Sequence, residues 1–163
     1  MRFAFLIFTA LVFGSLAYGQ GINGPQPILP QSPLTIVSGG KYHRFVIELA
    51  DDRIEQQRGL MFRQSVLPNE GMLFDFGSDF ERAFWMHNTL VSLDMIFIRS
   101  DGTIHRIAAK TTPLSDASVP SLGPVSAVLE LAGGRAAELG LKPGDQVRHQ
   151  IFNNYPPMKL VER

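Results

Sequence analysis

One short stretch of the chain carries several side chains that together could bind a ligand. Residues 84–94, FWMHNTLVSLD, hold the only tryptophan, followed by an amide, hydroxyls and an acid. Indole rings stack on sugars and other flat groups, and convergent polar side chains orient such ligands. The alternative is that the tryptophan only anchors the core, with its N–H bonded to a backbone carbonyl. The binding interpretation predicts a site formed by Trp85, Met86, His87, Asn88, Thr89 and Asp94.

Three charged residues are predicted to point inward, which is unusual for charged side chains. Glu48 and Glu130 lie within apolar strand patterns, and Arg58 lies on the apolar face of a predicted helix. A buried guanidinium keeps its charge and needs a carboxylate or several carbonyls as partners. We therefore expect a buried polar network of Glu48, Arg58 and Glu130. The alternative is a carboxylate-dependent hydrolase, with an acid–base pair drawn from Glu48, Asp94 and Glu130.

The methionines indicate a metal site as a further alternative. Thioether sulfur is a soft ligand that selects Cu(I), and Met61, Met72 and Met86 with His87 form the candidate set of a metallochaperone-like protein. Methionines also fill gaps in apolar cores and pack on aromatic rings. We expect no other cofactor, and packing competes with Cu(I) binding as the explanation.

Other catalytic patterns are missing from the sequence. The chain has no cysteine, which excludes thiolate chemistry and disulfides. It has no G-x-S-x-G motif, and Asp94 and His105 are expected to lie too far apart for a catalytic dyad. We therefore predict no catalytic residue and favour a protein that is not an enzyme.

The N-terminal part of the chain differs from the rest. Residues 1–19 combine one positive charge, an apolar run and small residues, the pattern of a signal peptide cleaved between Gly19 and Gln20. Residues 20–33 are rich in proline and predict a disordered tether, and residues 34–163 form one β domain. We therefore expect a periplasmic or secreted protein with no stable membrane insertion after cleavage.

Short apolar segments separated by turns predict the fold. A hairpin at Asp101-Gly102 would pair Ile98 with His105. Both faces of the sheet are apolar, so we expect a mainly β single domain, a compact barrel or sandwich covered on both sides. It should contain seven to eight short strands, the clearest over residues 34–37, 44–50, 71–76, 84–86, 93–99, 125–131 and 146–152.

Two short helices are expected, over residues 52–59 and 133–139. A capping box begins the first helix, and a glycine ends each of them. On the first helix Ile54, Arg58 and Met61 share one face, which we expect to turn toward the core.

Several motifs, taken in order, resemble one known family. The chain contains FVIELA (45–50), RGLMFR (58–63), GMLFDF (71–76), FWMHNTLVSLD (84–94), VLELAGG (128–134) and LGLKPGD (139–145). This succession resembles the DUF192 (UPF0127) family of unknown function, over nearly the whole chain after Leu34. The resemblance implies a compact β-barrel-like domain. The chain departs from the family pattern at His87, where the family usually has Lys, and at Ser92, where it usually has Pro. Because the family has no settled activity, the resemblance implies no mechanism.

The charge of the chain excludes one large class of partners. Fifteen basic and fifteen acidic residues balance each other, and no basic run occurs. Nucleic acids and anionic membranes need a clustered positive field. We therefore expect a non-enzymatic binding or accessory module whose partner is a small ligand, a glycan or a peptide, and the sequence leaves the oligomeric state open.

Overall fold

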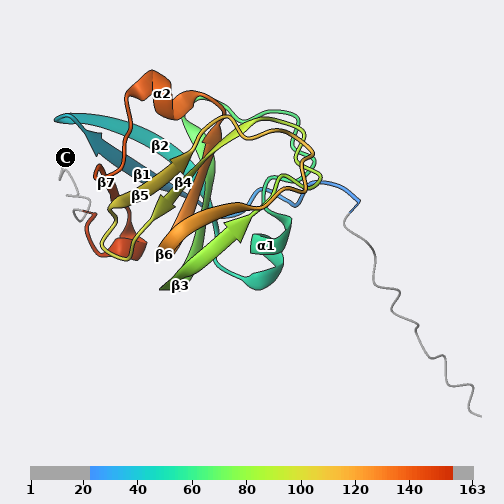
Figure 1. The fold of residues 1–163 in the computed structure, drawn as a ribbon, viewed down its shortest axis with the longest axis horizontal. Helices are drawn as coiled ribbons and strands as arrows, with labels where there is room; N and C mark the ends of the chain where they lie inside the picture. The colour runs from blue at the N-terminus through green and yellow to red at the C-terminus, as the bar shows by residue number, and fades with distance from the viewer. Residues whose placement is uncertain (1–22, 156–163) are drawn as a thin grey trace, which may run out of the picture.

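β-branched and aromatic residues dominate the apolar segments, and they build one curled sheet of seven strands (Figure 1). The computed structural model describes residues 23–155, so the predicted signal peptide lies outside the described residues. The strands are β1 (Gln31–Ser38), β2 (Lys41–Ala50), β3 (Glu70–Phe84), β4 (Leu93–Ile98), β5 (Ile104–Ala108), β6 (Val119–Ala132) and β7 (Gln146–Arg148). The helices are α1 (Arg53–Arg58), α2 (Arg135–Leu139) and the 3-10 turn η1 (Gln150–Phe152).

The strand order across the sheet is β5-β4-β6-β3-β2-β1-β7. Neighbours are antiparallel except β2 and β3, which run parallel. A parallel pair needs a crossover, and the segment containing α1 supplies it. None of the helices in the described part is long and apolar enough to cross a membrane.

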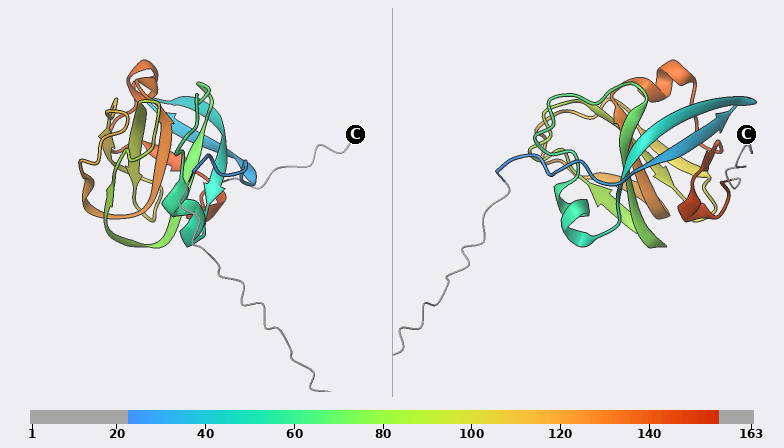
Figure 2. Two further views of the ribbon diagram at one scale, coloured as in Figure 1. Left: turned by 90° about the vertical axis from the view of Figure 1, so that its right-hand side faces the viewer. Right: turned by 180° about the vertical axis from the view of Figure 1, so that it is seen from behind.

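The sheet curls until its two edges meet at one end (Figure 2). Thr103, just before β5, pairs with Gln146 of β7. Nearby, the N–H of Ile104 donates to the carbonyl of Asp145 (2.9 Å) and the N–H of Val147 to the carbonyl of Gly102 (2.8 Å). The result is a half-barrel with two short helices, which confirms the predicted mainly β class.

Both faces of the sheet are covered, as the two-sided apolar pattern predicts. On β6, Leu129 and Leu131 point into one apolar cluster, and Val125 and Val128 belong to a second cluster. Strands that are buried on both faces read as continuous apolar runs. Any polar side chain on such a strand must therefore find its partners inside the protein.

Capping and side-chain hydrogen bonds hold α1 at one end of the sheet, on the side opposite α2 (Figure 1). Asp52 accepts the N–H groups of Ile54 (2.7 Å) and Glu55 (2.8 Å), so the predicted capping box is present. Gln56 donates to the carbonyl of Asp75 in β3 (2.6 Å). The expectation that Ile54 faces the core is wrong, because its side chain is 74% exposed. With only six residues, α1 turns the Arg58 end, and not Ile54, toward the sheet.

The proline-rich segment is ordered from Gln26 onward, which corrects the expected tether over residues 20–33. Gln26 is buried, and its amide donates to the carbonyl of Gly59 at the end of α1 (2.9 Å). Leu29 donates its N–H to the carboxylate of Glu48 (2.8 Å), and β1 already begins at Gln31. Hydrogen bonds to buried groups therefore hold this segment in place, although its composition is typical of a linker.

Two further predictions about the strands are wrong. The strand expected over residues 71–76 is not separate from residues 77–84, because the 14-residue β6 pairs with the 15-residue β3 across two register shifts. The hairpin register also differs, since Ile98 pairs with Ile104 and not with His105. A bulge after Phe97 absorbs one residue and moves the pairing by that amount.

Asp94 in β4 links the sheet to α2. Its side chain is completely buried, and its carboxylate accepts the N–H groups of Lys110 (2.7 Å), Gly134 (2.8 Å) and Ala136 (2.7 Å). A carboxylate that accepts three backbone N–H groups is satisfied without a countercharge. It fixes the start of α2 and the loop before β6 on the same strand.

We predict that Asp94→Ala lowers the free energy of unfolding by ~3 kcal/mol or more, because each buried N–H left without an acceptor costs roughly 1–3 kcal/mol. Asp94→Asn keeps one acceptor oxygen and should lose less. The exposed Asp51→Ala is the matched control and should change stability by less than ~0.5 kcal/mol. Urea unfolding measures all three, and an unchanged midpoint in Asp94→Ala would contradict this role.

Candidate functional site

A cavity of about 280 Å³ opens between α1, the inner half of β3 and the loop that follows β3. Helix α1 contributes a polar wall, the residues after it are apolar, and β3 contributes an aromatic wall. The loop after β3 closes one side, and a single residue of β6 forms part of the floor. The lining residues are Arg53, Gln56, Gln57, Arg58, Gly59, Leu60, Met61, Phe74, Phe76, Ala83, Phe84, Trp85, Thr89 and Glu130.

Glu130 is the acidic residue of this cavity. It lies near the C-terminal end of β6 and is 4% exposed, and its neighbours across the strands are Met72 and Met95. Within residues 23–155 its carboxyl group forms no ion pair, and burial is the only influence on its pKa. Burial among apolar neighbours disfavours the charged form and raises the pKa of Glu130 to about 8. Glu130 therefore holds a proton at neutral pH and can donate a hydrogen bond.

Arg58, the last residue of α1, faces the same cavity without forming the expected network. Its Nε is buried and has no hydrogen-bond partner in the described part of the chain. The expected partnership with Glu48 is wrong, because Glu48 pairs with Arg63 (3.0 Å) and also accepts from Leu29. The residues after α1 turn back at Gly59, which carries Arg63 toward β2 and leaves Arg58 beside the cavity.

The Glu48–Arg63 pair belongs to a second, smaller hollow of about 130 Å³. Both side chains are mostly buried, and the N-terminal segment covers the pair through Leu29. The three members of the predicted network are thus divided between two places. Arg58 and Glu130 line one cavity, and Glu48 lines the other.

Phenylalanines form the apolar wall of the main cavity. Phe74 and Phe84 meet edge to face with ring centroids 5.1 Å apart, and Phe76 meets Phe84 at 6.1 Å. Gly59 closes the corner, since its φ of +48° disfavours other residues and a Cβ there would lie 3.1 Å from the ring of Phe74. This wall is built by packing and has little freedom to collapse into the cavity.

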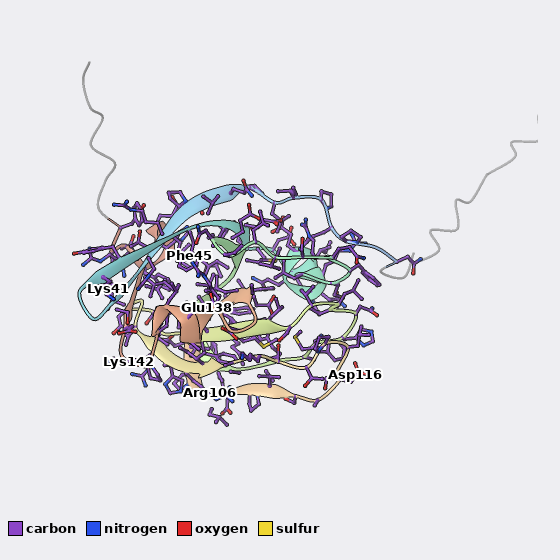
Figure 3. All side chains as sticks on the ribbon, turned by 90° about the horizontal axis from the view of Figure 1, so that it is seen from above. Lys41, Phe45, Arg106, Asp116, Glu138 and Lys142 are labelled. Atoms are coloured by element: carbon purple, nitrogen blue, oxygen red, sulfur yellow. The ribbon has the colours of Figure 1, made fainter. Side chains whose placement is uncertain are left out.

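Trp85 lies at the mouth of the cavity and is 51% exposed. Its ring stacks on His87 with centroids 4.9 Å apart, and His87 Nδ1 lies 2.6 Å from a carboxylate oxygen of Asp116. Figure 3 places Asp116 at the end of the molecule opposite Lys41 and Lys142. The interpretation of Trp85 as a core anchor is wrong, because half of its surface remains accessible. His87 and Asp116 fix the indole from outside.

Some of the remaining residues of the predicted loop site line the cavity, and others lie outside it. Thr89 is buried and lines the cavity. Asn88 adopts a positive φ of 54°, and its carbonyl accepts the N–H of Phe62, which joins the loops on either side of β3. Met86 is buried beneath the loop, and Asp94 lies apart from the cavity in the hydrogen bonds to α2. Of the six predicted loop residues, Trp85 and Thr89 line the cavity.

The candidate metal ligands do not surround one opening. Met61 lines the cavity, whereas Met72 and Met86 belong to the buried cluster beneath it. The sulfur of Met86 lies 3.1 Å from the hydroxyl of Thr111, and that of Met72 lies 3.8 Å from the amide of Gln26. The three sulfurs therefore have packing or hydrogen-bonding roles, and His87 bonds to Asp116 instead.

Sequence reasoning missed several residues of the site. Phe74 and Phe76 alternate along one strand face, and that period could have placed them together. Gln56 and Gln57 gave no signal, because exposed and cavity-lining glutamines look alike in a short helix. Asp116 lies in a loop 29 residues after His87, and nothing in its surroundings predicts that contact.

Comparison with known proteins assigns the chain to a family. The family model DUF192, described as an uncharacterized group, matches residues 34–149. The chain belongs to the DUF192 family. Among curated proteins, none matches this DUF192 chain.

Two solved structures are similar to this DUF192 protein along most of their length. A protein from Sinorhizobium meliloti 1021, described as a putative transcription regulator, has 38% identity and a TM-score of 0.75, covering 77% of this chain and 98% of its own. A protein of unknown function from Novosphingobium aromaticivorans DSM 12444 has 41% identity and a TM-score of 0.73, covering 77% of this chain and 91% of its own. These similarities support the fold and leave the function open.

We predict that Glu130 makes the domain less stable as the pH rises. The folded state keeps a proton up to a pKa of about 8 that the unfolded chain releases near 4.5. Stability from this group is therefore fully present below pH 4.5 and falls by about 1.4 kcal/mol per pH unit between pH 4.5 and pH 8.

Urea unfolding of Glu130→Gln and the unchanged protein at pH 5, 6.5 and 8 measures this effect. The amide cannot ionise, so the difference in unfolding free energy should grow steadily in favour of Glu130→Gln. Glu138→Gln, which changes an exposed acid of α2, is the matched control and should show no such trend. A constant difference across the three pH values would show that Glu130 is ionised in the folded state.

Proposed function

We propose that this DUF192 protein is a non-enzymatic binding module whose ligand enters the cavity beside Trp85. One observation carries the proposal. An accessible indole, an arginine and a buried carboxyl group converge on one opening. Buried polar groups are nearly always satisfied, so a buried arginine nitrogen without a partner, beside an acid that lines the same opening, favours a ligand as the missing partner.

The size of the cavity limits the ligand. A volume of about 280 Å³ lies at the small end of known ligand sites, which span roughly 300–1,000 Å³. The ligand is therefore a small molecule, or one group that projects from a larger partner such as a glycan or a peptide. The aromatic wall favours an apolar or flat portion, and the α1 wall favours a polar end.

The composition of the cavity supports binding over catalysis. Glu130 is the only carboxylate among the described lining residues, so a hydrolase mechanism that needs two carboxylates lacks its second group. No Ser, Lys or His lines the cavity within residues 23–155. The hydroxyl of Thr89 bonds to the carbonyl of His87 and has no base beside it.

The rest of the proposal follows from the sequence. The signal-like N-terminus supports a periplasmic or secreted location. The balanced charge of the chain gives no support for nucleic-acid binding, so the description of the Sinorhizobium protein is not extended to this one.

Titration of the tryptophan fluorescence tests the proposal directly, since Trp85 is the only tryptophan. We expect at least one member of a panel of monosaccharides, tripeptides and neutral or charged aromatic fragments to change the emission saturably. Ala83→Tyr should weaken that binding at least tenfold, because the added ring fills the cavity next to the aromatic wall.

Ala137→Tyr in α2 places the same ring on an exposed position away from the cavity and should bind as the unchanged protein does. Failure of the entire panel to change the emission would refute the binding proposal. An effective ligand that binds equally well to Ala83→Tyr would place its site elsewhere.

The Cu(I) alternative uses the same reporter with Ag(I) as the Cu(I) surrogate. We expect no saturable quenching at micromolar Ag(I), because the sulfurs of Met72 and Met86 are buried beside hydrogen-bond donors. Saturable quenching that disappears in Met86→Leu and Met61→Leu would instead establish a metal site.

A further inference from the structure

We propose that the cavity recognises the carboxylate of a small aryl or alkyl carboxylic acid, with one oxygen on Arg58 and the other on the carboxyl group of Glu130. This inference rests on the proposed function, because it names the ligand class of the same cavity. It concerns a reversible complex in which no covalent bond forms or breaks.

The first support is a pair of hydrogen-bond donors. The Nε–H of Arg58 is buried without an acceptor, and the carboxyl group of Glu130 forms no ion pair among the described residues. Both side chains line one cavity yet do not pair with each other. A carboxylate has two acceptor oxygens, so one such group can satisfy both donors at once.

The second support is the charge around Glu130. Helix α1 presents Arg53 and Arg58 to the cavity, whereas β3 and the loop after it present aromatic and small uncharged residues. The strand neighbours of Glu130 are Met72 and Met95. With its pKa raised to about 8 by burial, Glu130 adds no negative charge at neutral pH. The lining charges are then positive, which favours an anion.

The third support is the apolar wall opposite the donors. Phe74, Phe76 and Phe84 form one continuous edge-to-face group, and Trp85 extends it to the mouth. Such a surface suits the hydrocarbon part of an aryl or alkyl acid. A phosphate ester fits less well, because its dianion would bring more charge and more acceptor oxygens than the two donors satisfy.

Binding of a carboxylate to a protonated acid must weaken when that acid ionises. Carboxylate and carboxylic acid share one proton, and two adjacent carboxylates repel each other. Affinity should therefore be nearly constant from pH 6 to 7.5 and fall about 30-fold between pH 7 and 9.5 as Glu130 loses its proton.

Isothermal titration of the full mature chain with phenylacetate between pH 6 and 9.5 tests the inference. Phenylacetamide is the neutral probe of the same shape and should bind at least about tenfold more weakly at pH 7, because it lacks the charge that Arg58 recognises. Far-UV circular dichroism in the same buffers confirms that the chain remains folded at pH 9.5.

Two substitutions separate a role in recognition from a role in packing. Glu130→Gln keeps a donor but cannot ionise, so it should bind phenylacetate within about threefold of the unchanged protein and with no loss up to pH 9.5. Arg58→Met keeps the length of the side chain and should weaken binding by about tenfold or more. Arg44→Met in β2 is the matched control, because Arg44 is exposed and lies outside the cavity lining, and its effect should stay below about threefold.

The source of the carboxylate is tested in a separate arm. The tripeptide Gly-Gly-Phe presents the same group at a chain terminus, and its amidated form removes it. The small cavity favours the free acid, so phenylacetate should bind more tightly than the tripeptide. If the tripeptide binds more tightly than phenylacetate and its amidated form does not bind, the ligand is a peptide C-terminus and not a free acid.

The remaining outcomes distinguish this inference from the proposed function. Tighter binding of phenyl phosphate than of phenylacetate, or a pH profile unchanged by Glu130→Gln, would overturn the carboxylate proposal. Suppose that phenylacetate does not bind, but another fragment quenches Trp85 and no longer binds in Ala83→Tyr. The proposed binding module is then supported, and the proposed ligand class is wrong. If nothing binds, both proposals fail.

Discussion

The burial of both faces of β6 is the constraint on which the rest of this structure depends. Leu129 and Leu131 fill one side of the strand and Val128 the other, so a polar group there has no water to bond with. Two acids are buried in this part of the sheet, and they meet the constraint in opposite ways. Asp94 accepts three backbone N–H groups and organises the start of α2. Glu130 accepts none, keeps its proton and lines a cavity instead.

The cavity exists because hydrogen bonds between loops hold its walls apart. Gln26 fastens the end of α1, and Gln56 ties the same helix to β3. The loop that carries Trp85 is joined to its neighbours by the carbonyls of Asn88 and Thr89, which accept the N–H groups of Phe62 and Leu114. These bonds fix the backbone positions of the walls, and the packed phenylalanines add to their rigidity.

Periodicity and turn chemistry predicted the fold class, the capping box and the inward direction of Glu130, because each depends on residues close in sequence. The errors concern contacts between distant residues. Glu48 pairs with Arg63 and not with Arg58, since the sharp turn at Gly59 decides which arginine reaches β2. The cavity itself could not be predicted, because it depends on where α1 lies over β3. The bulge after Phe97 changes the pairing only beside the turn, at Ile98, and no local pattern specifies it.

The energetics of Glu130 bear on why the cavity is more than a packing defect. A leucine or methionine at this position would join Met72 and Met95 in the apolar cluster and remove the cost of burying an acid. Arg58 is equally poor as a structural residue, because its buried Nε has no partner in the described chain. Either residue alone could be a local imperfection. Two polar groups from different elements that line one opening without pairing with each other are harder to explain by folding. In the proposed complex, a bound carboxylate would give both groups a hydrogen-bond partner and offset the cost of burying them.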